Sequence, residues 1–475
     1  MPDSLFLGLI VIVFHVVVAP VAVAHALLYK RDYRSALGWI GVSILFPVAG
    51  PLLYFFFGVN RLRQRARELQ GEEHRQPFFE YGNRAARIPV ATGEGKLHYL
   101  ARSGRNVTMD RLIDGNHAEL LCNGDALYPR LIEAINAASD RAWVSSYIFS
   151  GEGIGGDIAD ALEAVADRGV DTRVLVDGFG ALYSRRSLQR RLEGTAVKFA
   201  QFLPPRVLPP SIHVNLRNHR KIAVIDNATA FFGGLNIDDR HFITRPRVDA
   251  PHEDVHFQAS GPVLATLAKL FARDWFAVTR ERLEVYDDVQ AHGDVQMRVI
   301  ASGPDESLYR LAMTMLGVVS AARHRIRIMT PYFLPHRELT GALQAAAIRG
   351  VRVEILLPEN SNLRYVDWAS RHQLWEFLKW GVEVRLDPPP FAHSKVILVD
   401  DDYVMAGSAN LDARSLRLNF EVGVEMFDAE LAARVHDYFD ANWNPARPVT
   451  LDEVDRRSLP VRLRDGFFWL FSGYL

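Results

Sequence analysis

Cysteine and net charge are both scarce in this chain of 475 residues. The single cysteine, Cys122, cannot form an intrachain disulfide and cannot by itself build a thiolate metal site. The formal net charge is -1, so the chain lacks the strong positive field that draws proteins onto nucleic acid. These absences exclude a disulfide framework and disfavour a nuclease.

Two long segments near the amino terminus contain no Asp, Glu, Lys or Arg. Residues 5–29 and 36–58 are both long enough to cross a hydrocarbon core of about 30 Å as helices. The leader before the first segment has no basic side chain, and the segment exceeds the apolar region of a secretory signal, which disfavours a signal peptide. We therefore predict that residues 1–60 form a membrane anchor of two transmembrane helices.

Basic residues beside these segments slightly favour a catalytic body on the cytoplasmic side, because such residues prefer that side. Three lie in the loop between the segments, and four arginines follow the second segment: Lys30, Arg31 and Arg34, then Arg61, Arg63, Arg65 and Arg67. Residues 61–110 show no clear period, and we interpret them as a linker.

The remainder of the chain is a repeat with a separation of about 180 residues. Residues 127–177 and 308–358 both predict a helix, a β-rich run, a second helix that ends at an Arg-Gly pair, and another β-rich run. Helices that alternate with β-branched strands indicate a layered α/β fold with a largely parallel sheet. We predict two pseudo-symmetric α/β/α halves, residues 111–285 and 286–475.

Each half contains the same polar pattern after a proline-rich loop, at residues 203–210 and 387–390. The spacing His-x-Lys-x4-Asp-x6-Gly-[Gly/Ser]-x-Asn occurs twice in a chain that has only seven lysines, so chance is an unsatisfactory explanation. The polar members of the two motifs are His219, Lys221, Asp226 and Asn236, then His393, Lys395, Asp400, Ser408 and Asn410.

Strand alternation predicts how these side chains point. Residues two apart share a face, so each histidine lies with its lysine, while each aspartate lies on the other face and favours a structural ion pair or turn. Two histidines, two lysines and two asparagines that converge would bind a tetrahedral anion, most simply a phosphodiester. Asn236, Asn410 and Ser408 are the candidate phosphate-binding donors.

The duplicated pattern resembles the HKD motif of the phospholipase D superfamily over residues 111–475. Within that superfamily, the tandem apolar segments and the runs 218–221, 331–333 and 410–421 look like those of bacterial cardiolipin synthases. The resemblance implies that one motif histidine attacks phosphorus to give a phosphohistidine, while the other protonates the leaving alcohol. His219 is the nucleophile by analogy and His393 the acid and base, although pseudo-symmetry allows either assignment.

Two close imidazoles push their titrations apart, which would leave a neutral nucleophile and a charged acid. Asp254 and Glu421 occupy matching places downstream, and each would orient its motif histidine. The halves differ where Gly234 replaces Ser408, and residues 387–391 lack the tyrosine that the resemblance implies. No Asp/His cluster has metal-ligand spacing, so we expect neither metal nor cofactor.

The leading hypothesis is transfer of a phosphatidyl group from one phosphatidylglycerol to another, which gives cardiolipin and releases glycerol, in the bacterial inner (cytoplasmic) membrane. Hydrolysis to phosphatidic acid, another acceptor alcohol, a nuclease and an inactive scaffold are the alternatives, and a homo-oligomer is compatible with the sequence. The expected partners are lipids and the bilayer. The aromatic cluster at residues 467–471 is too short to span, and either lies among headgroups or closes the core.

Overall fold

The computed structural model describes residues 13–30, 32–46, 48–58, 66, 68, 98–184, 186–205, 215–246, 248–305 and 307–473. Several sequence predictions extend outside these residues: the start of the first apolar segment, Arg31, the four arginines after the second segment, most of the linker, and residues 206–210 of the first proline-rich loop. The chain divides into two compact units, Met1–Arg65 and Ala66–Leu475.

The amino-terminal unit is a small helical assembly. It contains α2 (Ala19–Tyr29), α3 (Tyr33–Leu45) and α4 (Ala49–Leu53), with π-helical turns at Phe14–Val18 and Tyr54–Gly58. Its core is formed by Ala22, Ala26 and Tyr54, and the Tyr54 hydroxyl lies 2.7 Å from Nδ1 of His25. Many of its large apolar side chains are exposed. Among the described residues, no helix combines the length and apolar character needed to cross a bilayer.

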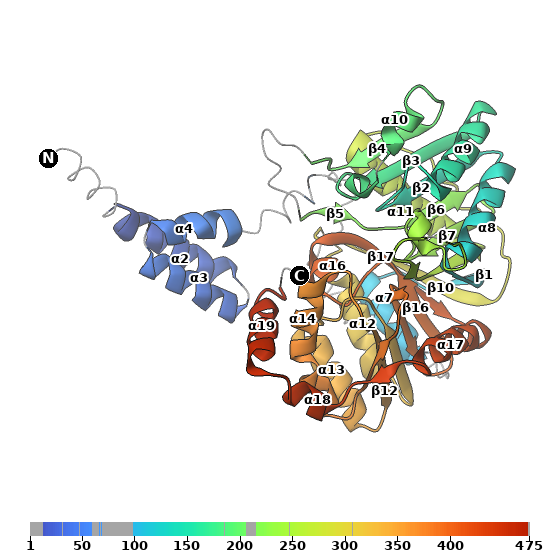
Figure 1. Ribbon diagram of the computed structural model, residues 1–475. Coiled ribbons are helices and arrows are strands. Elements are labelled where there is room, and N and C mark those ends of the chain that lie inside the picture. Colours follow the sequence, from blue (N-terminus) through green and yellow to red (C-terminus); the bar gives the residue numbers. More distant parts are fainter. Residues whose placement is uncertain are drawn as a thin grey trace. The chain divides into compact units, whose positions relative to one another are not determined.

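The second unit is built on one continuous mixed sheet (Figure 1). The first half contains β1 (Ile113–Cys122), α8 (Asn123–Ala137), β2 (Arg141–Ser146), α9 (Ile154–Asp167), β3 (Asp171–Asp177), α10 (Leu188–Leu192), β4 (Lys198–Phe202), β5 (Arg217–Asn218), β6 (Ile222–Ile225), β7 (Thr229–Gly233), β8 (His252–Glu253), β9 (Val255–Ser260) and α11 (Val263–Thr279).

The second half repeats most of this order and adds helices at its end. It contains β10 (Val295–Ser302), α12 (Arg310–Ala321), β11 (Arg325–Met329), α13 (Arg337–Ile348), β12 (Arg352–Pro358), α14 (Arg364–Gln373), α15 (Trp375–Leu378), β13 (Glu383–Asp387), β14 (Phe391–Ala392), β15 (Val396–Val399), β16 (Tyr403–Gly407), α16 (Ala413–Arg417), β17 (Asn419–Phe427), α17 (Ala429–Trp443), β18 (Arg447–Pro448), α18 (Leu451–Asp455) and α19 (Leu459–Trp469).

Pseudo-symmetry is visible in the strand order. From the centre outward the first half reads β1-β9-β7-β6-β2-β3-β4, and the second reads β10-β17-β16-β15-β11-β12-β13-β18. The halves join where β1 and β10 pair antiparallel, with Ile113 opposite Met297 and Asn116 opposite Val295. The two α/β halves predicted from the repeat are therefore present as one sheet rather than as two separate sheets.

The predicted largely parallel sheet is wrong. Only β2-β3-β4 and β11-β12-β13 form runs of parallel strands in the described part of the sheet, and the central strands pair antiparallel. The reason is the length of the connections. Parallel neighbours need a crossover helix, whereas β6-β7 and β15-β16 are joined by tight turns that permit hairpins alone.

Helices cover both faces of the sheet because neighbouring strand residues point in opposite directions. Val144 of β2 belongs to the core beneath α8 and α9, while the adjacent Trp143 stacks on Phe271 of α11 at 5.4 Å between ring centroids. The predicted helix ends are confirmed, since α9 and α13 end just before their Arg-Gly pairs. Gly169 and Gly350 adopt positive φ there, the left-handed conformation that favours glycine.

Part of the predicted linker is an ordered helix. Helix α7 (His98–Thr108) packs against α12 of the second half. It is held by the buried Arg298, whose guanidinium donates to the Ala101 carbonyl at 2.8 Å and pairs with Glu425 at 2.8 Å. The linker interpretation is therefore wrong for residues 98–108, because their partner lies about 200 residues away in the sequence.

Candidate active site

A short strand precedes each motif histidine and pairs with a strand of the opposite half. Strand β5, just before His219, pairs with β17 of the second half, and β14, just before His393, pairs with β8 of the first half. The backbone N–H of His219 then donates to the Phe420 carbonyl at 2.9 Å, and that of His393 donates to the Glu253 carbonyl at 2.6 Å. Each histidine thus stands beside the other half's carboxylate.

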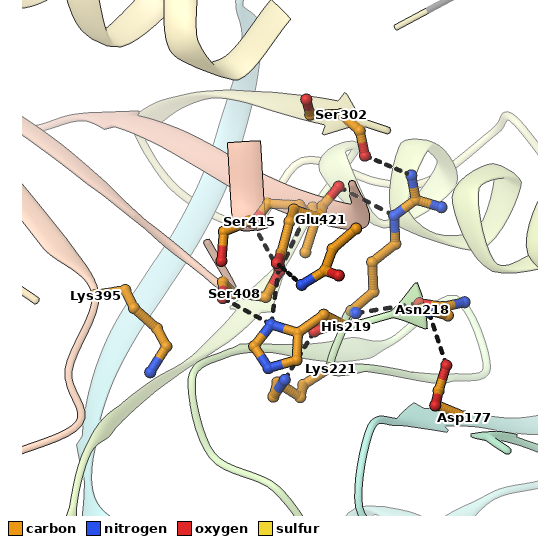
Figure 2. A network of polar contacts seen from close by, with 12 residues as sticks. Asp177, Asn218, His219, Lys221, Ser302, Lys395, Ser408, Ser415 and Glu421 are labelled. Atoms are coloured by element: carbon orange, nitrogen blue, oxygen red, sulfur yellow. Dashed lines mark hydrogen bonds and ion pairs between the residues drawn. The ribbon is translucent and has the colours of Figure 1, made fainter. Parts of the chain in front are cut away.

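The His219 ring is fixed by acceptors on one nitrogen (Figure 2). Its Nδ1 lies 3.0 Å from Oε2 of Glu421 and 3.1 Å from the Ser408 carbonyl oxygen. Because both neighbours accept hydrogen bonds, Nδ1 carries the proton and donates it. The other ring nitrogen, Nε2, therefore keeps its lone pair when the imidazole is neutral.

The His393 ring has an equivalent environment built from the other half. Its Nδ1 lies 2.7 Å from Oδ2 of Asp254, whose side chain is fully buried. Lys395 Nζ lies 2.9 Å from the same ring nitrogen, 3.6 Å from Asp254, and also donates to the His393 carbonyl. Asp254 accepts and so favours a proton on Nδ1, whereas the Lys395 ammonium donates and competes for the lone pair of the same nitrogen.

The expectation that each carboxylate orients the histidine of its own half is wrong. Glu421, downstream of the second motif, contacts His219, and Asp254, downstream of the first, contacts His393. The crossing follows from the pairing of β5 with β17 and of β14 with β8. Sequence order could not reveal it, because the two halves exchange these strands.

Each motif lysine lies beside the histidine of its own motif. Lys221 and Lys395 come just before strands β6 and β15 rather than within them. Lys221 Nζ donates to the His219 carbonyl at 2.7 Å and lies over the Tyr147 ring at 5.4 Å. Burial lowers the pKa of Lys221 to about 7 and that of Lys395 to about 8, although nearby carboxylates act in the opposite direction. Two cations with depressed pKa values form a site for an anion.

Charges from both halves act on each histidine, which places the two motifs within electrostatic reach of one another. Burial lowers the pKa of His219, against the raising effect of Glu421, and Lys395 of the other half lowers it too. Burial also lowers the pKa of His393, well below its ordinary value, and Lys395 adds to this. The expected division into a neutral His219 and a charged His393 is therefore not reproduced, because the same burial and lysine charges act on both.

The motif aspartates lie at turns, as strand parity predicts. Asp226 accepts hydrogen bonds from the backbone N–H groups of Ser139, Asp140 and Arg141, at 2.8 to 3.0 Å. Asp400 accepts equivalent bonds from residues 323–325, the shortest 2.7 Å from the N–H of His324. Both aspartates have positive φ at the start of a hairpin. They fasten each motif strand to the loop before β2 or β11, which is a structural role.

The candidate phosphate donors differ between the halves. Asn236 Oδ1 accepts from the backbone N–H of Ile148 at 3.2 Å, so its NH₂ group is the part that remains to donate. Asn410, equally buried, occupies the same motif position. The prediction that Ser408 donates to phosphate is wrong. Its hydroxyl donates to Glu421 at 2.5 Å and accepts from the Val422 N–H. Its hydrogen is therefore committed to orienting that carboxylate.

Gly234, the counterpart of Ser408, has a packing reason to lack a side chain. A Cβ at this position would overlap the carboxylate of Asp254. Asp254 is one methylene shorter than Glu421, and its backbone neighbour Val255 supplies an N–H at 2.8 Å in place of a serine hydroxyl. The pairs Gly234 with Asp254 and Ser408 with Glu421 are thus two solutions for holding a carboxylate against a histidine.

Two tyrosines flank the histidines, and neither was assigned to the site from the sequence. The Tyr147 ring lies 5.0 Å from that of His219, and the Tyr332 ring lies 6.5 Å from that of His393. Tyr332 was considered from its Pro-Tyr-Phe run, whereas Tyr147 was not singled out. The repeat does not pair these tyrosines, because the spacing that aligns Arg141 with Arg325 puts Tyr147 opposite Pro331.

Buried Arg220, between the motif His and Lys, was also not singled out as a site residue. Its guanidinium pairs with Asp274 and donates from Nε to the Glu421 carbonyl at 3.0 Å. Asn218 donates to the same Asp274 at 3.1 Å and accepts from the backbone N–H of Arg220 at 3.1 Å. This network ties α11 of the first half to β17 of the second.

In the described residues, no group of three or more His, Cys, Asp or Glu side chains is arranged to hold a metal ion.

We predict an alkaline limb in the pH profile of kcat/KM. A lysine carries its charge below its pKa, so attraction for a phosphate anion weakens as pH rises through about 7 to 8, the values for Lys221 and Lys395. The variant Lys221→Arg keeps a charge at all these pH values, and should move its share of the limb to higher pH. Initial rates between pH 5 and 10 measure the position of this limb. An unchanged limb in Lys221→Arg would show that the titration of Lys221 does not cause it.

The chain matches the family described as cardiolipin synthase, PLD-like domain, at residues 131–275 and 315–443. Residues 9–58 match the family described as phospholipase D-nuclease N-terminal. The two parts of the first match contain the two motif histidines, one in each. The matched residues make up more than half of the chain.

Curated relatives match nearly the full length of the chain. Cardiolipin synthase A of Pseudomonas putida (strain GB-1) is 32% identical, with 91% of each protein covered. The major cardiolipin synthase of Bacillus subtilis (strain 168) is 29% identical, with 94% of this chain and 95% of the relative covered. Among solved structures, phosphatidylserine synthase of Haemophilus influenzae Rd KW20 shares the fold, with a TM-score of 0.59, 17% identity and coverage of 79% of this chain and 99% of that one.

Proposed function

Because the chain belongs to the family of phospholipase D-like cardiolipin synthases, we propose that it transfers a phosphatidyl group between two molecules of phosphatidylglycerol. The products are cardiolipin and glycerol. The observation that carries this proposal is the pair of histidines, each with Nδ1 held by a buried carboxylate of the opposite half and with a motif lysine beside it. Such an arrangement suits a phosphodiester, which needs a nucleophile, an acid and cations together.

The reaction has two balanced steps. Nε2 of His219 attacks phosphorus, the bond from phosphorus to the glycerol oxygen breaks, and His393 gives its proton to the leaving oxygen. His393 then removes the proton from a hydroxyl of the second phosphatidylglycerol, whose oxygen attacks phosphorus and releases His219. The bond energy stays in the covalent intermediate, so no nucleotide is required.

The proposed proton carrier is His393, and a bound phosphodiester helps it to hold the proton. Burial, and after it the charge of Lys395, lower its pKa, but a phosphodiester anion adds negative charge beside the ring and raises that pKa again. Asp254 stabilises the imidazolium through Nδ1. Lys221, Lys395, Asn236 and Asn410 surround the phosphate oxygens in this proposal, while Glu421 and Ser408 position His219.

The lipid substrates suit a membrane location. We propose that residues 1–60 anchor the protein in the bacterial inner (cytoplasmic) membrane as a two-helix hairpin, with the catalytic halves, residues 111–285 and 286–475, on the cytoplasmic side. The outward apolar side chains of α2 and α3, among them Leu27, Leu28 and Leu37, support this placement. The partners are then phosphatidylglycerol, cardiolipin and the bilayer, with nucleic acid excluded.

Product analysis tests the proposal. Purified full-length protein with labelled phosphatidylglycerol in mixed vesicles should form cardiolipin and an equal amount of glycerol, because the intermediate is attacked by a lipid hydroxyl. Thin-layer chromatography and mass spectrometry quantify both products. Phosphatidic acid without cardiolipin would identify a hydrolase instead, and added ethanolamine or another alcohol would reveal a different acceptor.

The same assay with a chelator tests whether the reaction requires a metal ion. Neither the proposed nucleophile nor the proposed acid needs a metal ion, so dialysis against EDTA should leave the rate of cardiolipin formation within about twofold. Loss of activity that added divalent cations restore would contradict the two-histidine mechanism.

A further inference from the structure

Helix α19 exposes a continuous apolar face. Leu463, Phe467, Leu470 and Phe471 lie four, eight, eleven and twelve residues after Leu459 along the helix and its last turn, so all five share one side. Each is between 46% and 71% exposed. Among the described residues of the second unit, no other helix exposes as many large apolar side chains, and such a patch marks an interaction surface.

The opposite side of α19 is firmly docked, so the exposed face has a fixed direction. Phe468 packs against Trp368 of α14 with ring centroids 5.1 Å apart, and Trp469 packs against His372 at 5.2 Å. Asp465 is fully buried on this side and accepts from Arg457 at 2.6 Å. Phe468 and Trp469 of the aromatic cluster therefore close a small core, as one of the two alternatives predicted, while Phe467 and Phe471 face outward.

That small core continues to the proposed active site. Leu334, Val366 and Ala369 form it, and Phe468, Trp469 and Tyr332 pack against it. Tyr332 also packs against His393, with ring centroids 6.5 Å apart. Whatever binds the outer face of α19 is therefore connected to the reacting histidine by one layer of packed side chains.

The charges around the face indicate an anionic partner. Helix α19 exposes Arg462, while its one acidic residue, Asp465, is buried and neutralised by Arg457 and the half-buried Arg464. Arg456 precedes the helix and is largely exposed, although it also pairs with Asp452. Arginines beside an apolar stripe of leucine and phenylalanine are typical of helices that lie in the headgroup layer of a membrane.

We propose that the outer face of α19 lies in the interface of an anionic lipid surface and holds the catalytic unit against it. This contact is additional to the amino-terminal anchor and does not depend on which phosphotransfer reaction the site performs. Leu463 and Phe467, at the centre of the face, enter the boundary between headgroups and acyl chains, while Arg462 contacts lipid phosphates.

An environment-sensitive fluorophore tests the contact. It is attached at Leu463→Cys in full-length protein that also carries Cys122→Ala, with Ile348→Cys as the matched control, an exposed apolar residue of α13. With phosphatidylglycerol vesicles, the label at 463 should brighten severalfold and shift to the blue, the label at 348 should not, and phosphatidylcholine vesicles should give a smaller response. Equal responses at both positions, or from both lipids, would overturn the proposal.

A second copy of the chain is the competing occupant, and the same label detects it. A response at position 463 that rises with protein concentration without vesicles would assign the face to self-association and overturn the lipid contact.

Activity measurements separate this proposal from the proposed function. The variant Leu463→Glu/Phe467→Glu should lose about tenfold in activity on vesicles but keep its rate on short-chain, monomeric phosphatidylglycerol. The control variant Ile348→Glu should keep its rate on both substrates. Equal loss on both substrates would indicate a structural role, whereas no reaction by the unaltered protein would contradict the function alone.

Discussion

Replacing His219 with alanine is expected to lower cardiolipin formation by about 10⁴-fold or more, because the covalent route loses its nucleophile. Replacing His393 should have a similar effect on the natural substrate, since the glycerol oxygen then leaves without a proton. Neither variant should unfold, because both side chains border the site rather than fill the apolar core. Steady-state rates with labelled phosphatidylglycerol, and thermal melting as a control for folding, measure both effects.

An activated substrate separates the two roles. A phosphatidyl ester of p-nitrophenol needs no acid to release its leaving group, so His393→Ala should still give a burst of one nitrophenol per site, followed by slow turnover. His219→Ala should give no burst. The reverse pattern would make His393 the nucleophile, and a His219→Ala variant as active as the unaltered protein would indicate a different chemistry or a scaffold.

The two buried carboxylates should show the second largest effect. Glu421→Gln and Asp254→Asn keep size but remove the charge that holds each Nδ1 proton and stabilises imidazolium, so kcat should fall by about 10² to 10⁴-fold with little change in KM. Both side chains are fully buried, so solvent cannot replace the lost charge. Rates on vesicles and on short-chain substrate measure the loss.

The crossed pairing makes a sharper prediction with the activated substrate. Glu421 contacts His219, the proposed nucleophile, so Glu421→Gln should slow the burst itself. Asp254 contacts His393, so Asp254→Asn should leave the burst near its normal rate and slow the later turnover. If each carboxylate instead served its own half, the two variants would exchange these effects. Ser408→Ala should resemble a mild form of Glu421→Gln, because its hydroxyl orients that carboxylate.

Local spacing carried most of the candidate site. The repeated motif identified both histidines, both lysines and both asparagines, and strand parity separated Asp226 and Asp400 from them. The directions of the histidine, lysine and aspartate side chains could be inferred because these residues lie a few positions apart, where backbone geometry fixes direction. Phosphate binding by the asparagines stays a prediction. Tyr147 could not be found in this way, because the repeat places it opposite Pro331.

Long-range partners were beyond the sequence. The exchange of β5 and β14 between the halves decides which carboxylate meets which histidine, and no local pattern records it. The antiparallel centre of the sheet was misjudged because the β-rich runs that follow each motif were treated like those joined by helices. Helix α7 was missed for a related reason, since its buried partner Arg298 lies in another part of the chain.

The most direct test is a crystal structure of the full chain with vanadate or tungstate, tetrahedral oxyanions that can mimic phosphate. We expect one oxyanion bound between Nε2 of His219 and Nε2 of His393, on opposite sides of the central atom, with Lys221 and Lys395 contacting its oxygens. Oxyanions bound separately in the two halves, or imidazoles that open into different cavities, would contradict it.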